Sequence, residues 1–322
     1  MKHISIYQTE LPEMAHFQNL LLDSQRVSEE GEEKMLLLCP PCGEHSMSSF
    51  GFDPEHPILK TESGFCLQFK FETKKVTKTL VDQQVAKKIE RLKLDNPEFN
   101  RLSKKQKSEI TEEVKAGLVK RAIAEESFVK AYYHAESGLL ILNVSTEDKA
   151  GTILAFLRRM LGSLKTTTLH VDGVSNGLTK NIQYNIENDK GLGFKGFSFG
   201  NILNLQNSDE SKAHFNGDYE LETLLDLINQ GYEVVKVELE RDGLGFTLNS
   251  DLKITGLKLA STLTEELEEQ VLDTFGEGEV DLELIKKETQ FVEEQTQVEL
   301  LVGISNDLVA FFSELIPAEN AA

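Results

Sequence analysis

Tryptophan is absent from this 322-residue chain, cysteine occurs only three times, and no apolar run is long enough to cross a membrane. A transmembrane helix needs about 20 consecutive, mostly apolar residues, so we expect none. Three cysteines in a chain of this length do not form a disulfide framework. The N-terminal residues lack the basic and then apolar segments of a signal peptide. These absences favour a cytoplasmic protein without a membrane partner.

Positive charge is also scarce: 34 lysines and arginines stand against 54 aspartates and glutamates, a net charge of -20. This balance argues at first against a nucleic-acid partner. The charge is unevenly distributed, because residues 74–130 contain 15 basic and 9 acidic residues while the rest of the chain has a net charge of -26. Exposed charges act over about 10 Å, so this segment can attract phosphate groups. The alternative is a solvated helical pair with a chance surplus of lysine.

Apolar patterning predicts both strands and helices. The expected strands are 4–7, 65–71, 139–144, 166–171, 233–240, 246–248, 252–259 and 298–304. The expected helices outside the basic segment are 12–23, 150–161, 221–229, 262–275 and 306–315. Residues 180–210 are polar and rich in glycine, and no pattern resolves them. Strands and helices without a repeating β-α-β period indicate an α+β fold with mixed or antiparallel sheets.

The basic segment consists of two predicted helices. Apolar residues spaced four, four and three positions apart from Val81 onward predict the first helix, which ends at residues 95–97. The second begins at Ser103, which can form a capping box with Gln106, and runs to about residue 126. Two helices joined by a short polar break should pack as an antiparallel hairpin.

Lysine and arginine gather at particular places on these helices. Lys104, Lys105 and Lys107 lie at the start of the second helix, where positive charge opposes the helix dipole. Lys87 and Arg91 are four residues apart and therefore stack on one flank of the first helix. This placement suits a negatively charged partner better than it suits helix stability.

Cys39-Pro40-Pro41-Cys42 has the spacing of a redox pair or of half a zinc site. A redox pair needs a helix directly after it, and Gly43 with the serines that follow weakens a helix there. Structural zinc needs four ligands, and only His45 and Cys66 could complete the set. The alternative interpretation is a tight Pro-Pro turn with two buried thiols. We expect neither a metal nor a cofactor.

Gly191-Leu192-Gly193-Phe194-Lys195-Gly196 matches the letters of the dinucleotide-binding fingerprint. That fingerprint has its meaning only between an apolar strand and the start of a helix, and the preceding residues here are polar. We interpret the segment as a loop, in which Lys195 could contact a phosphate incidentally. The seven histidines are scattered, and neither a nucleophile elbow nor a complete P-loop is present. We therefore expect no enzymatic activity.

Four stretches together carry a family resemblance. They are Pro41-Cys42-Gly43, the charged pair from Lys87 to Ala122, Gly138-Leu139-Leu140-Ile141-Leu142, and Leu157-Arg158-Arg159-Met160-Leu161-Gly162-Ser163-Leu164. The last stretch is the most specific. The sequence resembles the RdgC family of recombination-associated proteins over residues 30–170, and more weakly but in the expected order afterwards.

The resemblance implies a curved subunit and a ring-shaped homodimer around double-stranded DNA, bound without sequence preference in the nucleoid. Such a ring would limit the access of a RecA-type recombinase or a nuclease to the DNA. The implied domains are a central domain (1–76 and 128–172), a protruding helical hairpin arm (77–127) and a C-terminal α+β domain (173–322). The implied DNA-binding residues are Lys74, Lys75, Lys87, Lys88, Arg91, Arg101, Lys104, Lys105, Lys107, Lys120 and Arg121.

The chain departs from the family pattern in two places near these residues. Lys120-Arg121-Ala122-Ile123 stands where the family has Pro-Arg-Ala-Phe, whose phenylalanine helps to close the ring, so Ile123 is the expected dimer contact. A lysine-containing loop of the family aligns near residues 215–217, where only Lys212 and His214 are close. The alternative function is therefore an acidic interaction or inhibitor protein of the same fold that binds a basic protein and has lost DNA binding.

Overall fold

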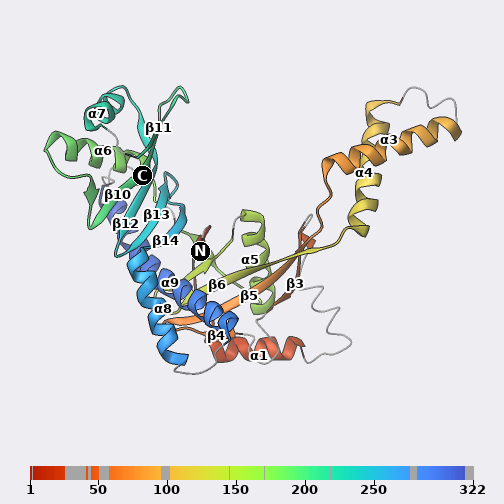
Figure 1. Ribbon diagram of the computed structural model, residues 1–322, viewed down its shortest axis with the longest axis horizontal. Coiled ribbons are helices and arrows are strands. Elements are labelled where there is room, and N and C mark those ends of the chain that lie inside the picture. The colour runs from red at the N-terminus through yellow and green to blue at the C-terminus, as the bar shows by residue number, and fades with distance from the viewer. Residues whose placement is uncertain are drawn as a thin grey trace.

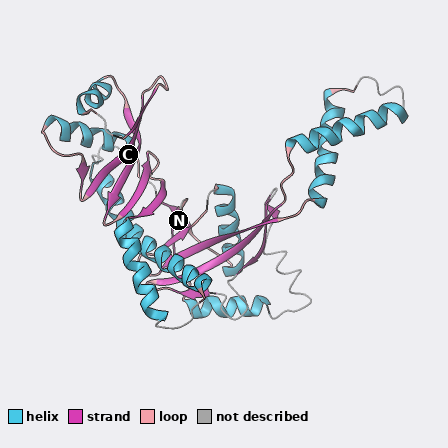
Figure 2. Ribbon diagram, viewed as in Figure 1, coloured by secondary structure: helices cyan, strands magenta, loops and turns pink. Residues whose placement is uncertain are grey.

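The computed structural model describes residues 1, 3–25, 41–42, 45–50, 58–95, 102–144, 146–169, 171–217, 220–275 and 281–315. Within them the chain forms two antiparallel sheets flanked by helices, and two further helices project beyond the end of the first sheet (Figures 1 and 2). The α+β class is confirmed. No helix in this part of the chain is both long and apolar enough to cross a membrane.

The first sheet has the strand order β2-β3-β5-β6-β7-β1-β8, with β4 paired to β5. Its longest strands, β5 (Gly64–Thr73) and β6 (Glu125–His134), pair along their whole length. Close pairing requires glycine at position 64, where a Cβ atom would lie 2.0 Å from the Tyr133 carbonyl oxygen. The other strands are β1 (Ser5–Thr9), β2 (Pro41–Cys42), β3 (His45–Phe50), β4 (Ile58–Lys60), β7 (Leu139–Leu142) and β8 (Thr166–Thr168).

Successive side chains of β5 point to opposite sides of the first sheet, and other elements cover both of these sides. On one side Phe65 packs against Phe17 of α1 (Met14–Gln25), and Phe69 packs against Phe156 of α5 (Glu147–Leu161). On the other side Cys66 belongs to the hydrophobic core that the first sheet shares with the C-terminal half of the chain. The predicted strand over 65–71 and helix over 150–161 are confirmed.

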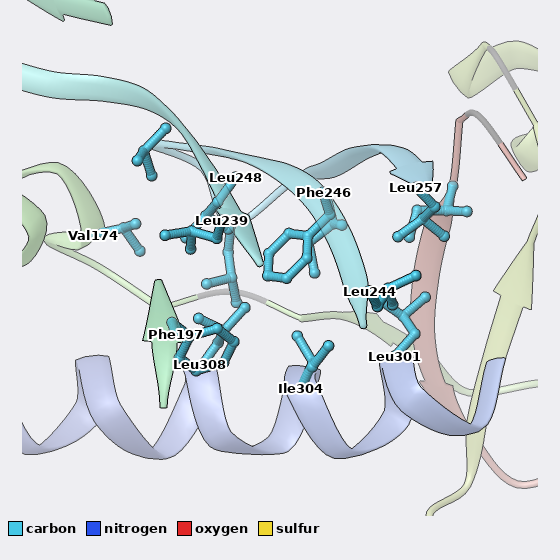
Figure 3. Packing of buried hydrophobic residues seen from close by; sticks show 14 of the residues in the cluster. Val174, Phe197, Leu239, Leu244, Phe246, Leu248, Leu257, Leu301, Ile304 and Leu308 are labelled. Carbon is cyan, nitrogen blue, oxygen red and sulfur yellow. The ribbon is translucent and has the colours of Figure 1, made fainter. Parts of the chain in front are cut away.

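The second sheet has the strand order β11-β10-β12-β13-β14, with β9 paired to β10. Figure 3 shows its core, in which Phe197, Leu239 and Phe246 pack against the last long helix. Its strands are β9 (Gly193–Phe194), β10 (Phe197–Gln206), β11 (Lys212–Asn216), β12 (Glu233–Arg241), β13 (Leu244–Asn249) and β14 (Ile254–Leu259). The accompanying helices are α6 (Val174–Glu187), α7 (Leu221–Asn229), α8 (Ser261–Phe275) and α9 (Leu282–Leu315).

The strand predicted over 298–304 is wrong, because these residues lie inside α9, a helix of 34 residues. Val298, Leu301, Ile304, Leu308 and Phe312 are buried at helical spacing. A short apolar run containing β-branched residues fits a strand and a buried helix equally well. Packing of α9 against both halves of the molecule decides in favour of the helix.

The glycine-rich segment also has a definite structure. Phe194 pairs with Phe197, so Lys195 and Gly196 form the two-residue turn of the β9–β10 hairpin. Both turn residues have positive φ, 43° and 84°, which Gly196 adopts without strain. The Lys195 ammonium group pairs with Glu314 at 2.7 Å. This hairpin lacks the strand-to-helix turn of a dinucleotide site. The segment therefore matches that fingerprint in its residue types but not in its structure.

Candidate nucleic-acid interface

The basic helices are an insertion into the long β5–β6 pair. The chain leaves the sheet after Thr73 and returns at Glu125, and these two residues are opposite each other in the ladder. Between them lie α3 (Lys78–Asp95) and α4 (Lys104–Arg121). From here on we call residues 74–124, which lie between these two strands, the arm, in place of the range 77–127 expected from the sequence. In Figure 1 the arm lies apart from both sheets, and the two helices cross in this view.

One ion pair joins the base of the arm to the sheet, and a second links the two long strands beside it. The Lys75 ammonium group lies 3.1 Å from Glu125 Oε2, and the Lys70 ammonium group lies 2.6 Å from Glu126 Oε1. The Lys75 and Glu125 side chains are each about two-thirds exposed, so solvent screens their attraction strongly. Lys75 thus has a protein partner and a solvent-facing position at once.

The start of α4 has the predicted capping box. The Gln106 backbone N–H donates to Ser103 Oγ at 3.2 Å, and the Ser103 backbone N–H donates to Gln106 Oε1 at 2.9 Å. The end of α4 corrects the prediction, since the helix stops at Arg121 and not near residue 126. Ala122 has extended backbone, and the next residues enter β6, a strand whose pairing with β5 the local pattern does not reveal.

The charges of α4 are segregated around the helix. At about 100° per residue, four cations fall within a sector of about 120°: Lys104, Lys107, Lys115 and Arg121. The opposite side carries all three carboxylates together with the remaining two cations: Glu109, Glu112, Glu113, Lys105 and Lys120. One side of α4 is therefore basic without acidic residues, and it is the side better suited to a phosphate backbone.

On α3 the predicted cations have different surroundings. Lys87 and Arg91 are exposed. Lys88 is half-buried and its ammonium group lies 2.5 Å from Glu113 of α4, which ties the two helices together. Lys74, which precedes the helix, is half-buried. Arg101 lies outside the described residues.

Few apolar side chains hold the arm together. Val81 is the one buried residue of α3 and Ile110 the one buried residue of α4. Beyond the arm helices, Ile123 is 90% exposed and Phe128 of β6 is 57% exposed. Covering an aliphatic side chain as exposed as Ile123 with a partner surface lowers the free energy of the system.

The C-terminal half has the opposite charge. The arm's described residues contain 13 basic and 6 acidic residues, whereas α8 together with residues 281–294, which include the first part of α9, contains 2 basic and 10 acidic residues. Lys212 and His214 lie close to the position where the lysine-containing loop of the resembling family aligns. Both are exposed on the edge strand β11. They belong to the second sheet and not to the arm.

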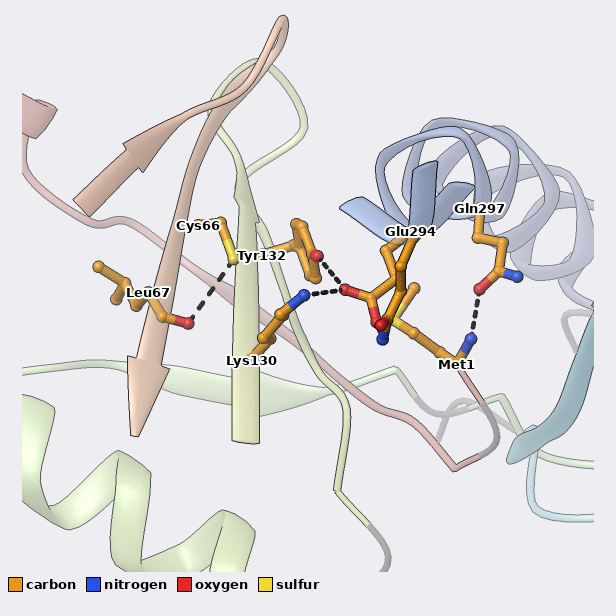
Figure 4. Close-up of polar contacts among 8 residues, drawn as sticks. Met1, Cys66, Leu67, Lys130, Tyr132, Glu294 and Gln297 are labelled. Carbon is orange, nitrogen blue, oxygen red and sulfur yellow. Dashed lines mark hydrogen bonds and ion pairs between the residues drawn. The ribbon is translucent and has the colours of Figure 1, made fainter. Parts of the chain in front are cut away.

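A buried polar network joins α9 to β6 (Figure 4). Glu294 Oε2 accepts hydrogen bonds from the Lys130 ammonium group at 2.7 Å and the Tyr132 hydroxyl at 2.6 Å. Burial alone would raise the pKa of Glu294, but the hydrogen bonds from Lys130 and Tyr132 outweigh it and hold the pKa below its ordinary value. Sequence reasoning missed this network, because Lys130 and Glu294 are 164 residues apart.

The cysteine hypothesis receives a partial test. Cys39 lies outside the described residues, and the side chain of Cys42 is not among those described. Cys66, the third cysteine, is fully buried in β5, and burial raises the pKa of its thiol to about 12. Within the described part of the chain no three histidine, cysteine, aspartate or glutamate side chains are grouped as a metal site requires.

Comparisons with known proteins assign the family. A family model described as "Putative exonuclease, RdgC" matches residues 22–298. The chain belongs to the RdgC family. It is 23% identical over 233 residues to the recombination-associated protein RdgC of Pseudoalteromonas atlantica, which covers 70% of this chain and 75% of that protein.

Two further members of the family show a similar level of identity. The recombination-associated protein RdgC of Colwellia psychrerythraea is 26% identical over 264 residues, covering 74% of this chain and 80% of that protein. The RdgC protein of Haemophilus influenzae is 25% identical over 250 residues, covering 74% and 79%. RdgC membership makes this chain a recombination-associated protein. The names of the relatives refer to recombination, while the description of the family refers to an exonuclease.

Proposed function

We propose that this member of the RdgC family binds double-stranded DNA without sequence preference, through the basic side of the arm. The observation that carries the proposal is the segregation of charge on α4, where Lys104, Lys107 and Arg121 are exposed on a side without carboxylates. Contacts of lysine and arginine with phosphates supply affinity and carry no direct sequence information. The acidic remainder of the chain repels the same backbone and so directs the DNA to the arm.

The functional unit is a homodimer that closes around the duplex. Two observations support this. Ile123 is almost fully exposed at the base of the arm, and the arm and second sheet form the two limbs of a U-shaped outline (Figure 1). A second subunit across the open side would complete a ring. Bound DNA would then be less accessible to a RecA-type recombinase or a nuclease, as expected of a nucleoid-associated protein.

In this function the arm binds DNA and does not cleave it. The names of the relatives support a role in recombination, and we assign the arm to binding alone. Incubation of end-labelled duplex with the protein and Mg²⁺ tests this part directly. Progressive shortening of the labelled strand by the wild type, absent with Lys104→Glu/Lys107→Glu/Arg121→Glu, would show that this chain cleaves DNA and would favour the exonuclease description.

The decisive experiment is fluorescence anisotropy of a labelled random-sequence duplex over a salt series. The wild type is compared with Lys104→Glu/Lys107→Glu/Arg121→Glu. Each phosphate contact contributes about -0.9 to the slope of log K against log salt. The loss of roughly three contacts should therefore make the slope of the variant less steep by about three such contributions, and the variant should lose most of its affinity at low salt.

A matched control changes the net charge equally but away from the arm: Lys180→Glu/Lys286→Glu/Lys287→Glu. These three lysines are exposed on α6 and α9. If the control loses as much affinity as the arm variant, net charge governs binding and the assignment to the arm is wrong. Failure of the wild type to bind at low salt would overturn DNA binding altogether.

A second candidate function has its own supporting observation. Leu272 near the end of α8 and Leu282 and Leu284 at the start of α9 are exposed, and many carboxylates accompany them in the sequence. A surface of that kind fits a basic protein partner with an apolar anchor. Without DNA binding, salt-sensitive association with a RecA-type recombinase, lost in Leu282→Asp/Leu284→Asp, would establish this acidic interaction function instead.

A further inference from the structure

Two adjoining cavities lie where the first sheet, the second sheet and α9 meet. One has a volume of about 410 Å³ and the other about 500 Å³. They share Ile4, Ser5, Glu147, Asp251 and Lys253 as lining residues, and we treat the two adjoining cavities together as one site. Pockets of roughly 300–1,000 Å³ are typical of sites for small molecules.

The cavity of about 410 Å³ has apolar side chains from distant parts of the chain in its wall. Ile6 of β1, Ile254 of β14 and Leu308 of α9 contribute to its wall. Leu252, in the turn between β13 and β14, is held at a φ of 61°. A leucine adopts this backbone conformation only where its surroundings determine it, and here it places Leu252 in the wall.

An unpaired hydroxyl group lies at this cavity. Ser305 of α9 lines the site and is 2% exposed, and its Oγ has no hydrogen-bond partner among the described residues. A buried hydroxyl without a partner costs free energy, and most buried polar groups in proteins have one. Rotation about χ1 breaks no hydrogen bond of this group, so an acceptor that enters the cavity can pair with it.

The charged residues of the site define the kind of ligand. Lys253 lies 3.8 Å from Glu147, and the Asp251 carboxylate, which also accepts a hydrogen bond from the Lys253 backbone N–H, leaves an excess of one negative charge. We propose that the site binds a small amphipathic amine. Its apolar body would lie between the two sheets, an oxygen would accept from Ser305, and its ammonium group would lie near Glu147 and Asp251. The site is separate from the arm, and the inference does not depend on DNA binding.

Dansylcadaverine is a suitable probe, because it combines a naphthalene ring, sulfonyl oxygen acceptors and a primary amine. Its fluorescence should rise saturably with one site per chain. The N-acetylated derivative lacks the charge and should bind at least about tenfold more weakly, since hydrogen bonds to charged groups contribute about 1.5 kcal/mol or more. The anionic 8-anilinonaphthalene-1-sulfonate reports non-specific apolar binding.

Gly151 allows the cavity to be filled without backbone strain. It lines the site from α5, and a Cβ atom built there has no atom within 4 Å. Gly151→Leu should abolish probe binding, and circular dichroism shows whether the variant is folded. Gly303→Leu is the matched control, because Gly303 is also helical, exposed and free of neighbours at its Cβ position, yet does not line the site.

Ser305→Ala provides an independent test if Gly151→Leu does not fold. Loss of an unpaired hydroxyl should raise the melting temperature of the free protein while weakening the probe about fivefold. Three results would overturn the proposal: no saturable binding to the wild type, equal binding to Gly151→Leu and Gly303→Leu, or binding of the anionic probe at least as tight as that of the amine and lost in Gly151→Leu.

Discussion

Replacement of Lys130 by methionine should lower the free energy of unfolding by about 3 kcal/mol. The Lys130 ammonium group lies 2.7 Å from Glu294, whose side chain is only 8% exposed. Methionine keeps most of the volume but leaves the carboxylate buried, with hydrogen bonds from Tyr132 and Gln290 alone. Loss of one partner in a buried pair costs far more than the roughly 0–1 kcal/mol of an exposed pair, because the remaining charge is not solvated.

Urea denaturation of Lys130→Met, Glu294→Gln and the double variant measures this coupling as a double-mutant cycle. In the double variant no buried charge is left alone, so its stability should lie within about 1 kcal/mol of the wild type. A cost below about 1 kcal/mol for Lys130→Met, with no coupling in the cycle, would refute the reasoning. The network would then contribute little to holding α9 on β6.

The same network predicts a dependence of stability on acid. The pKa of Glu294 is lowered in the folded state, so its ionised form stabilises the fold above its ordinary value of 4.5. That contribution is lost as the pH falls from 4.5 through the folded-state pKa. Glu294→Gln should therefore lose less stability than the wild type between pH 5 and pH 3, at roughly constant ionic strength. Parallel stability curves for the two proteins would contradict the assignment.

Three further changes test other features. Ile123→Asp should shift the protein towards the monomer in light scattering coupled to size exclusion, because it places a charge where an exposed aliphatic side chain is proposed to meet its copy; an unchanged mass would remove Ile123 from the interface. Ser103→Ala should destabilise the first turn of α4 by about 1 kcal/mol, seen as faster amide exchange there, and unchanged exchange would show that the capping box contributes nothing. In a Cys39→Ser/Cys42→Ser background, Cys66 should react with a disulfide reagent at pH 8 only as the chain unfolds, because it is buried and its pKa is raised to about 12; reaction within seconds would contradict this.

Local chemistry explains which elements could be predicted. The capping box depends on residues three positions apart, and the alternation from Phe65 to Phe71 depends on residues two apart, so both can be read from neighbours in the sequence. The errors occur where distant pairing competes with local pattern. The second arm helix was extended into Glu125–His134, a segment that becomes a strand because β5 pairs with it.

The candidate interface divides in the same way. The surplus of basic residues over 74–130 follows from composition alone. Which cations have protein partners depends on tertiary contacts, as the pairs of Lys75 with Glu125 and of Lys88 with Glu113 show. Helical phase, once the bounds of α4 are known, separates Lys107 from its acidic neighbours.

The sequence by itself determined the α+β class, the basic arm within an acidic chain and the motifs that carry the RdgC resemblance. Each of these features depends only on residues close together in the sequence or on composition. Only the tertiary structure decided that residues 298–304 are helical, that Glu294 meets Lys130, and that Ser305 lies beside a cavity between the sheets. The physical reason is that α9 buries its apolar side against strands far away in the chain. Such contacts are selected by the free energy of burial over the whole fold and not by local preference.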